Sequence, residues 1–446
     1  MAARRVSAEK VDPAPLGRPL AFEFSGKTAK NRFLKAAMSE LQSSWDNKDL
    51  TKRGIPPKEL VNVYRRWGEG GFGLILLGNT MIEYDQLEAA GNHIIPSDAP
   101  FFGERFERFK EIASAAKENG SLVYTQLSHP GRQVHADIQP NPISASDVQL
   151  TNSAFGEFAK PRPMEKADFE RVINGFAHAA EYCYKAGFDG VQLHGAHGYL
   201  LAQFLAPSTN KRTDEYNGSL LNRARLIFEI TDAIRARVPD KSFSIGIKLN
   251  STEFQQGGFT VEDCKVLCAE LEKHQFDWIE LSGGTYEALA FEHKRESTKK
   301  REAFFIEFAE LIIPELKKTK AYITGGLRTA AGMVKALDVL DGVGIGRPAA
   351  HEFSLPQKLI DGVVDAAIQP LIDEGNFMIT NVAATTQMNL VGHDREPLDL
   401  SRADHEKVFS EAVAKWLELR QKNGPSGPPV IEGFDLQSYG TAYAAA

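Results

Sequence analysis

Residues 187–225, GFDGVQLHGAHGYLLAQFLAPSTNKRTDEYNGSLLNRAR, decide how this chain folds. The short apolar run at 191–193 predicts a buried strand. Three polar side chains follow where that strand ends: His194, His197 and Tyr199. An Asn-Gly turn signal and a serine N-cap then lead into a predicted helix, LLNRARLIFEITDAIRARV. A barrel built of such strand, loop and helix units would point the three side chains into its mouth, where barrel enzymes keep their active sites.

The same alternation of strand and helix recurs along the chain. Eight short apolar runs predict strands, at 33–38, 74–77, 122–127, 191–193, 243–249, 278–281, 321–324 and 342–345. Helical patterns lie between them, at 57–67, 102–119, 166–185, 261–274 and 301–317. Eight alternations with near-continuous apolar strands predict an α/β fold, a parallel sheet closed into a (β/α)8 TIM barrel over 20–353.

Two regions depart from this rhythm. Residues 128–165 are rich in Pro, Ser and Asn and are too long for an ordinary connection, so they are expected to fold over the barrel mouth as a substrate lid loop. A second lid loop is expected after Gly284. A C-terminal extension at 354–446 is expected to carry helices at about 355–374 and 404–422, followed by a Pro- and Gly-rich tail.

Composition narrows the class of protein. The 446 residues are 42% hydrophobic and 25% charged, which is ordinary for a globular protein, and a net charge of −7 argues against nucleic acid as a partner. Cys183, Cys264 and Cys268 cannot form a disulfide framework and suit a reducing compartment. No signal peptide or membrane span is recognised. These features predict a cytoplasmic protein with neither a membrane nor a nucleic acid as partner, while the oligomeric state has no signal.

The His-x-x-His spacing has two interpretations. Paired imidazoles bind zinc readily, but no Glu or Cys stands at ligand spacing beside His194 and His197. A lone loop histidine is usually just a solvated side chain, whereas two histidines with Tyr199 two residues later form a denser constellation. We therefore favour a pair of hydrogen-bond donors with a proton donor, and expect no metal.

Three separated motifs also resemble those of one family, in the same order. They are YTQLSHPGRQ at 124–133, the His-x-x-His-x-Tyr motif, and YITGGLRTAAGMVKAL…DGVGIGRPA at 322–349. Together they resemble the Old Yellow Enzyme family of flavin-dependent ene-reductases over 20–353. The resemblance implies a tightly bound, non-covalent flavin mononucleotide (FMN), NAD(P)H as the reductant, and small-molecule activated alkenes as substrates.

Glycines after the last two predicted strands suit the flavin phosphate. Gly325 and Gly326 end one strand, and Gly346 with Arg347 ends the next, which matches the phosphate site found after strands seven and eight in barrels. Glycines let backbone N–H groups approach a phosphate, and Arg347 would add charge-assisted hydrogen bonds.

Two further strand ends suit the flavin ring. Gln126 ends the third strand and can both donate and accept, as the pyrimidine edge requires. Lys248 closes the fifth strand and would place a positive charge where a reduced flavin gathers negative charge. The resemblance places both residues in the flavin site, although the family often has Arg at the position of Lys248. Lysine keeps the charge and loses the planar fork.

The resemblance also assigns residues near the ring that spacing alone would not identify. Ala37, Met38 and Ser39 fall in its flavin-contacting segment, with Ser39 where the family has Thr or Cys bonded to the flavin C4 carbonyl. Asn79 matches a position that touches the ring. Leu41 stands where the branch bearing Cys has a substrate-facing Tyr, so that branch's lid geometry is not expected here.

The resulting functional prediction is an FMN-dependent ene-reductase. His194 and His197 would hold a carbonyl or nitro oxygen of the substrate, and Tyr199 would protonate the α-carbon. The alternatives are an FMN-barrel isomerase in a biosynthetic pathway and a non-catalytic flavin-binding protein. An iron-sulfur branch would need four closely placed cysteines, and this chain has only three. A barrel that modifies transfer RNA would need a basic surface and a loop cysteine near the site, and the sequence shows neither.

Overall fold

The computed structural model describes residues 3–151, 156–251, 253, 257–282, 309–423, 436 and 440–443. Its centre is a closed barrel in the strand order β10-β11-β12-β3-β4-β5-β8-β9, with every neighbouring pair parallel. The strands are β3 (Phe33–Lys35), β4 (Leu74–Met81), β5 (Leu122–Ser128), β8 (Gly190–Gly195), β9 (Ser244–Asn250), β10 (Trp278–Ser282), β11 (Lys320–Thr324) and β12 (Gly342–Ile345). The predicted barrel is therefore confirmed, and only β3 is clearly shorter than its predicted run.

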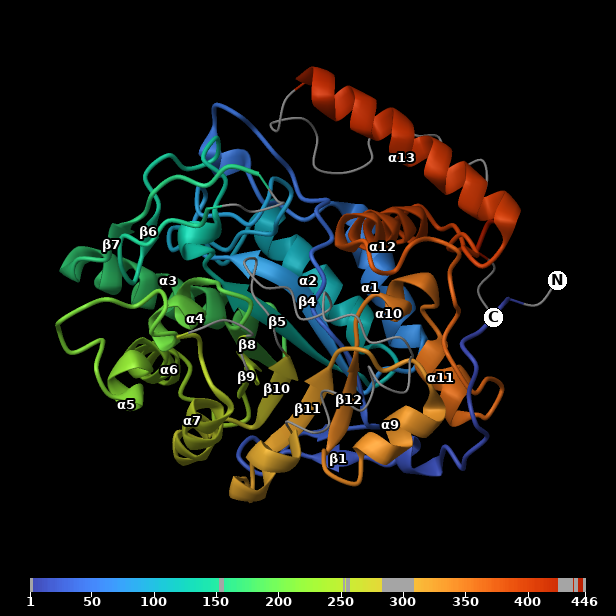
Figure 1. Ribbon diagram of the computed structural model, residues 1–446, viewed down its shortest axis with the longest axis horizontal. Coiled ribbons are helices and arrows are strands. Elements are labelled where there is room, and N and C mark those ends of the chain that lie inside the picture. The colour runs from blue at the N-terminus through green and yellow to red at the C-terminus, as the bar shows by residue number, and fades with distance from the viewer. Residues whose placement is uncertain are drawn as a thin grey trace.

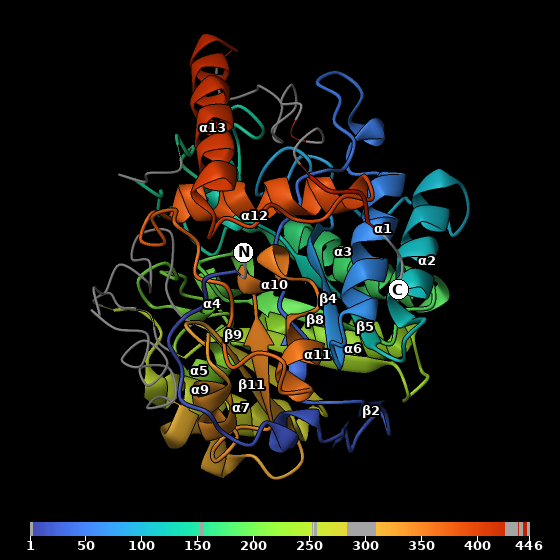
Figure 2. The ribbon, with the colours of Figure 1, turned by 90° about the vertical axis from the view of Figure 1, so that its right-hand side faces the viewer.

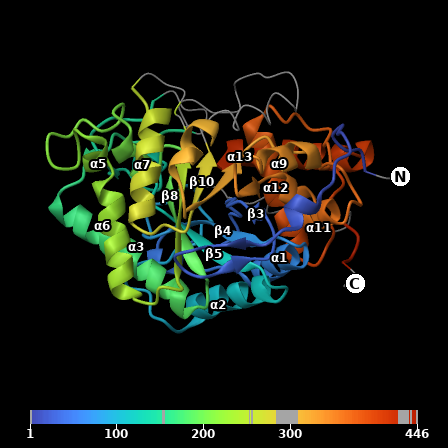
Figure 3. The same ribbon diagram turned by 90° about the horizontal axis from the view of Figure 1, so that it is seen from below.

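Helices surround the barrel (Figures 1 and 3). They are α1 (Lys58–Glu69), α2 (Glu104–Lys117), α3 (Lys166–Lys185), α4 (Leu200–Leu205), α5 (Leu220–Arg223), α6 (Arg225–Arg237), α7 (Val261–Lys273), α9 (Ala330–Ala336), α10 (Pro348–His351) and α11 (Leu355–Ile360). The helix predicted after the Asn-Gly turn is divided at Ala224. Of the helix predicted at 301–317, residues 301–308 lie outside the described residues, 309–312 are helical, and the 3-10 turn η4 (Ile313–Glu315) follows.

Shorter elements complete the described part of the chain. These are the 3-10 turns η1 (Ala14–Gly17), η2 (Leu50–Lys52), η3 (Gly131–Gln133) and η4 (Ile313–Glu315), and the paired strands β1 (Leu20–Ala21) with β2 (Thr28–Ala29) and β6 (Ile143–Ser144) with β7 (Arg162–Pro163). The elements η3, β6 and β7 belong to the long connection that leaves β5 at its C-terminal end. The lid loop expected after Gly284 lies outside the described residues.

Aromatic side chains opposite glycines fill the half of the barrel nearer the N-terminal ends of its strands. Trp278 of β10 faces Gly246 of β9, where an added Cβ would stand 2.3 Å from the indole ring. Two more strand pairs repeat the arrangement, Tyr124 with Gly190 and Tyr322 with Gly342. The glycines leave the room that these rings need in the close-packed interior, so the N-terminal end of the barrel is plugged by apolar side chains. Polar residues occupy the strands above that plug.

The C-terminal extension is folded against one side of the barrel (Figures 1 and 2). Helix α12 (Phe377–Gly392) packs on α1 and α10, and α13 (Ala403–Asn423) lies further out, with a small apolar cluster joining the two. The helix predicted at 404–422 is confirmed. The helix predicted at 355–374 is wrong: α11 ends at Ile360, and Gly362 takes the left-handed backbone (φ 65°) that closes helices.

Helix α12 has no counterpart among the predictions. Its sequence, FMITNVAATTQMNLVG, is rich in β-branched residues and carries apolar groups all round, so it lacks the 3.6-residue period that marks a surface helix. Such a helix is stable where neighbours cover most of its sides, which α1, α10 and α13 do. None of the described helices combines the length and the apolar character needed to span a bilayer.

Candidate flavin and active site

The three side chains singled out in the opening stretch meet at the C-terminal end of β8. His194 is on the strand, His197 is in the following loop, and Tyr199 is the N-cap residue of α4. The His194 ring centroid lies 5.3 Å from that of His197 and 4.6 Å from that of Tyr199. The structure therefore brings the expected constellation together, with Tyr199 only 3% exposed.

Both imidazoles are neutral at physiological pH. Burial first, and then the neighbouring His197 and the positive charge of Lys248, hold the pKa of His194 well below its usual value. Burial and Lys248 lower the pKa of His197 to about 3. His194 Nδ1 accepts a hydrogen bond from the Ala196 N–H (3.3 Å), so its proton is on Nε2. His197 Nε2 lies 2.9 Å from Ser282 Oγ, at the end of β10.

The backbone of His197 is held in an uncommon conformation. Its φ of 57° lies in the left-handed region, which residues other than glycine adopt only at a cost in conformational energy. The end of β9 and the turn η3 hold it there, because Asn250 Oδ1 accepts from the His197 N–H (3.2 Å) and the Gln133 side chain donates to the His197 carbonyl (3.1 Å). The position of the ring is thus fixed by the tertiary structure.

A row of polar side chains crosses the barrel just above its apolar plug. Gln126 Nε2 donates to Gln192 Oε1 (2.7 Å), and Gln192 Nε2 donates to Glu280 Oε2 (2.7 Å). Lys248 Nζ donates to Glu280 Oε1 at 2.8 Å. The sequence interpretation identified both ends of this row, Gln126 and Lys248, and missed Gln192 and Glu280. Their signal was a polar residue at an inward position of an otherwise apolar strand.

The segment after β3 meets the end of β4 through a carboxylate that sequence reasoning also missed. Ser39 Oγ and Asn79 Nδ2 both donate to Glu88 Oε2, each at 2.6 Å. Ala37 and Met38 are half-buried in the same segment. Asn79 Oδ1 is buried and has no hydrogen-bond partner among the described residues, which leaves an acceptor for a bound group.

A buried polar cluster fixes this segment from behind. Glu40 accepts hydrogen bonds from the Tyr64 hydroxyl, from His93 Nε2 (2.9 Å) and from the Gly78 N–H (3.2 Å). Burial by itself would raise the pKa of Glu40, but His93, Lys35 and Tyr64 together lower it to about 2. The ionised carboxylate therefore holds the segment after β3 against β4, and this contact positions Ser39 beside Asn79.

The ends of β11 and β12 leave room for a phosphate. Gly325 and Gly326 have φ values of 144° and 73°, so both peptides take conformations that favour glycine. A Cβ built on Gly346 would meet no atom within 4 Å, so that strand end is open. Beside it, Arg347 Nη1 donates to Thr380 Oγ1 of α12 at 2.5 Å, and this contact ties the C-terminal extension to the same corner.

These observations pass the test of fit for a flavin nucleotide. An unsatisfied amide oxygen on β4, an open glycine-lined strand end and an arginine after β12 stand at the same end of the barrel, and each suits a different part of the cofactor. Within the described residues, no group of three His, Cys, Asp or Glu side chains is arranged to hold a metal ion. The mouth thus defines a class of protein, the flavin-binding (β/α)8 barrels.

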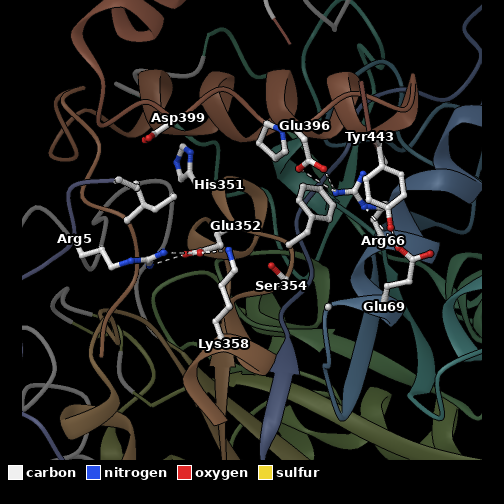
Figure 4. Close-up of a pocket in the computed structure, with 15 residues that line it drawn as sticks. Arg5, Arg66, Glu69, His351, Glu352, Ser354, Lys358, Glu396, Asp399 and Tyr443 are labelled. Carbon is white, nitrogen blue, oxygen red and sulfur yellow. Dashed lines mark hydrogen bonds and ion pairs between the residues drawn. The ribbon is translucent and has the colours of Figure 1, made fainter. Parts of the chain in front are cut away.

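A cavity of about 510 Å³ lies elsewhere, at the seam between the barrel and the terminal segments (Figure 4). Its charged lining is already paired. Arg5 bonds both oxygens of Glu352 (2.8 and 2.7 Å), and Arg66 bonds both oxygens of Glu396 (3.0 and 3.1 Å). Tyr443 stacks on the Arg66 guanidinium. These contacts fasten the termini to the barrel, and none of the residues proposed for the mouth lines the cavity.

Comparison with known proteins specifies the class further. The sequence profile of the NADH:flavin oxidoreductase / NADH oxidase family matches residues 15–365. The chain is 46% identical over 433 residues to the NADH-dependent flavin oxidoreductase nadA of Aspergillus parasiticus, covering 96% of this chain and 97% of the relative. It is 33% identical over 371 residues to the NADH-dependent flavin oxidoreductase iccE of Talaromyces variabilis, covering 75% and 84%.

Solved structures agree at the level of the fold. Morphinone reductase superimposes with a TM-score of 0.65 at 22% identity, covering 80% of this chain and 92% of that one. An Old Yellow Enzyme homologue from Zymomonas mobilis gives a TM-score of 0.63 at 23% identity, covering 79% and 94%. The chain belongs to the NADH:flavin oxidoreductase / NADH oxidase family, which confirms the resemblance to the Old Yellow Enzymes. It is an oxidoreductase whose cofactor is FMN and whose reductant is NAD(P)H.

Proposed function

We propose that this enzyme is an ene-reductase that reduces activated carbon–carbon double bonds conjugated to a carbonyl or nitro group. One observation carries the proposal: two neutral imidazoles and a buried tyrosine converge at the end of β8, in the mouth of the barrel. Neutral imidazoles are hydrogen-bond donors without a full positive charge, so they can hold a substrate oxygen and stabilise the negative charge that develops on it.

The residues divide the chemistry among them. The hydride for the β-carbon of the alkene would come from bound FMN that NAD(P)H has reduced. His194 donates through Nε2–H to the substrate oxygen, because its Nδ1 is occupied as an acceptor from Ala196. His197 donates from Nδ1 when Ser282 donates its hydroxyl proton to Nε2. Tyr199 then gives its phenolic proton to the α-carbon.

We further propose which residues hold the cofactor. Gly325, Gly326, Gly346 and Arg347 would bind the phosphate through backbone N–H groups and the guanidinium. The ring would be bound by side chains and backbone from the first, second, third and fifth barrel strands: Ala37, Met38, Ser39, Asn79, Gln126 and Lys248. The barrel over 20–353 is then the catalytic unit, and the extension over 354–446 supports its phosphate corner through Thr380.

The free, buried state of the cysteines supports a reducing, cytosolic setting for this chemistry. Small-molecule alkenes are the partners that a mouth of this kind would accept. The NADH named for both fungal relatives makes NADH the first reductant to assay.

The test separates the two half-reactions by stopped-flow absorbance of the flavin. In Tyr199→Phe, oxidation of reduced FMN by an enone such as 2-cyclohexenone should slow by about 10² to 10⁴, a general-acid contribution, while reduction by the nicotinamide changes little. Only the alkene half-reaction needs a proton at carbon. Equal slowing of both half-reactions would make Tyr199 a structural residue, and a colourless protein that takes up no FMN would refute the whole proposal.

A further inference from the structure

Glu280 is the only carboxylate in the polar row that crosses the barrel. It lies on β10 and is fully buried, at 0% exposure, and its two oxygens accept from Lys248 Nζ (2.8 Å) and from Gln192 Nε2 (2.7 Å). Gln192 in turn accepts from Gln126 Nε2 (2.7 Å). One acidic side chain therefore contacts Lys248 directly and Gln126 through a single intermediate.

The carboxylate fixes the direction of every hydrogen bond in the row. An ionised Glu280 can only accept, so Gln192 must present its NH₂ group to it and its carbonyl oxygen to the other side. Gln126 must then donate its own NH₂ group to Gln192, which turns Gln126 Oε1 away from Gln192. A side-chain amide could otherwise point either way. The charge on Glu280 thus sets which end of Gln126 acts as an acceptor.

The same carboxylate determines how much of the Lys248 charge is felt above it. Lys248 is 4% exposed and its neighbour on β10, in register, is Glu280. Below the pair lie Tyr124, Trp278 and Tyr322, an apolar layer, and the buried Lys35 of β3 is the further cation whose charge is felt at Glu280 among the described residues. Within that surrounding, an anion at 2.8 Å offsets much of the field of the cation. A group bound above the row would see a partly neutralised lysine.

We propose that Glu280 is a positioning residue of the FMN site, which orients Gln126 as an acceptor toward the flavin pyrimidine edge and lowers the reduction potential by offsetting Lys248. This inference rests on the proposed placement of FMN above Gln126 and Lys248. It predicts opposite effects for the two members of the ion pair. Removing Lys248 destabilises the anionic reduced flavin, and removing the charge of Glu280 stabilises it.

The experiment measures the flavin midpoint potential of holoenzyme variants by dye equilibration. Glu280→Gln should raise the potential by about 30 mV, which is a tenfold shift in the ratio of affinities for reduced and oxidised FMN in a two-electron couple. Lys248→Met should lower it by a similar amount. Asp277→Asn is the matched control, since Asp277 is an equally buried acid just before β10 that accepts from the backbone of residues 24 and 25. It should leave the potential unchanged.

A second variant tests the orientation of Gln126 without changing any charge. Gln192→Met interrupts the row between Glu280 and Gln126, so FMN should dissociate about tenfold more readily while its potential stays near that of the parent. Fluorescence of released FMN on dilution measures the dissociation constant. This variant also keeps the inference testable if Glu280→Gln folds poorly.

The outcomes distinguish a failure of the role proposed for Glu280 from a failure of the proposed FMN placement. If Lys248→Met lowers the potential and Glu280→Gln leaves it unchanged or lowers it, Glu280 has no such role and the FMN placement stands. If neither variant moves the potential, the placement of FMN above this row is wrong. Unchanged FMN binding in Gln192→Met would overturn the orienting role of Glu280.

Discussion

Replacing His351 should make the protein less sensitive to acid. His351 ends α10 in the seam under α12, is 7% exposed, and its Nδ1 faces the Gln387 side-chain NH₂ at 3.5 Å. That NH₂ group donates to the Leu398 carbonyl, so it is a donor and His351 Nδ1 must be the acceptor. Burial first, and then the charges of Arg328 and Arg347, lower the pKa of His351 to about 3. The folded protein therefore keeps this imidazole neutral.

The consequence for stability follows from proton binding. An unfolded chain would bind a proton at His351 below pH 6.5, whereas the folded chain binds one only near pH 3, so stability is lost as the pH falls through that window. Between pH 7 and pH 5 the loss from one such group is about 2 kcal/mol. His129 and His197, whose pKa values burial also lowers to about 3, each add a similar loss, and the lowered pKa of His194 acts in the same direction. Glu83, whose pKa burial raises to about 7, offsets about one of these losses, because its protonation stabilises the folded protein over the same pH range.

A comparison of variants isolates His351 from the other groups. Urea unfolding of wild type and His351→Gln at pH 7 and pH 5, with FMN in fixed excess, gives the pH-dependent change in unfolding free energy for each. The change should be smaller by about 2 kcal/mol in His351→Gln. The exposed His393 provides a control, and His393→Gln should behave as wild type. An equal pH-dependent loss in His351→Gln and wild type would refute the assignment of a neutral, buried imidazole.

Three further predictions concern the mouth and the barrel interior. His194→Ala should weaken binding of a phenol, read from its charge-transfer absorbance with oxidised FMN, by about 1.5 to 3 kcal/mol, because a charge-assisted hydrogen bond is lost; unchanged affinity would remove His194 from the substrate site. Arg347→Met should weaken FMN binding about 10- to 100-fold by dilution assay, with Thr380→Ala affecting it much less; equal effects would make Arg347 a link to α12 only. Gly246→Ala should lower the unfolding free energy in urea by about 1 to 3 kcal/mol, since its methyl group would overlap the Trp278 ring; unchanged stability would mean that the plug has spare room.

The barrel itself was predictable because it depends on patterns that are local in the chain. Each strand is a short apolar run bounded by turn residues, and the alternation with helices leaves few arrangements besides a closed parallel barrel. The same reasoning predicted a helix over 355–374 that ends at Ile360, and it did not predict α12. A helix that is covered on several sides needs no amphipathic period, so the sequence carries no sign of which face is buried.

The candidate site divides in the same way. The sequence by itself determined which residue types stand at strand ends, and so which could reach the mouth: the His194 motif, Gln126, Lys248 and the late glycines. Only the tertiary structure decided their partners, because hydrogen bonds across a barrel join residues far apart in the chain. Lys248 looked like an isolated cation until β10 placed Glu280 against it, 32 residues further on. The protonation state and the orientation of each group follow from those contacts, since burial and neighbouring charge, rather than residue type, set them.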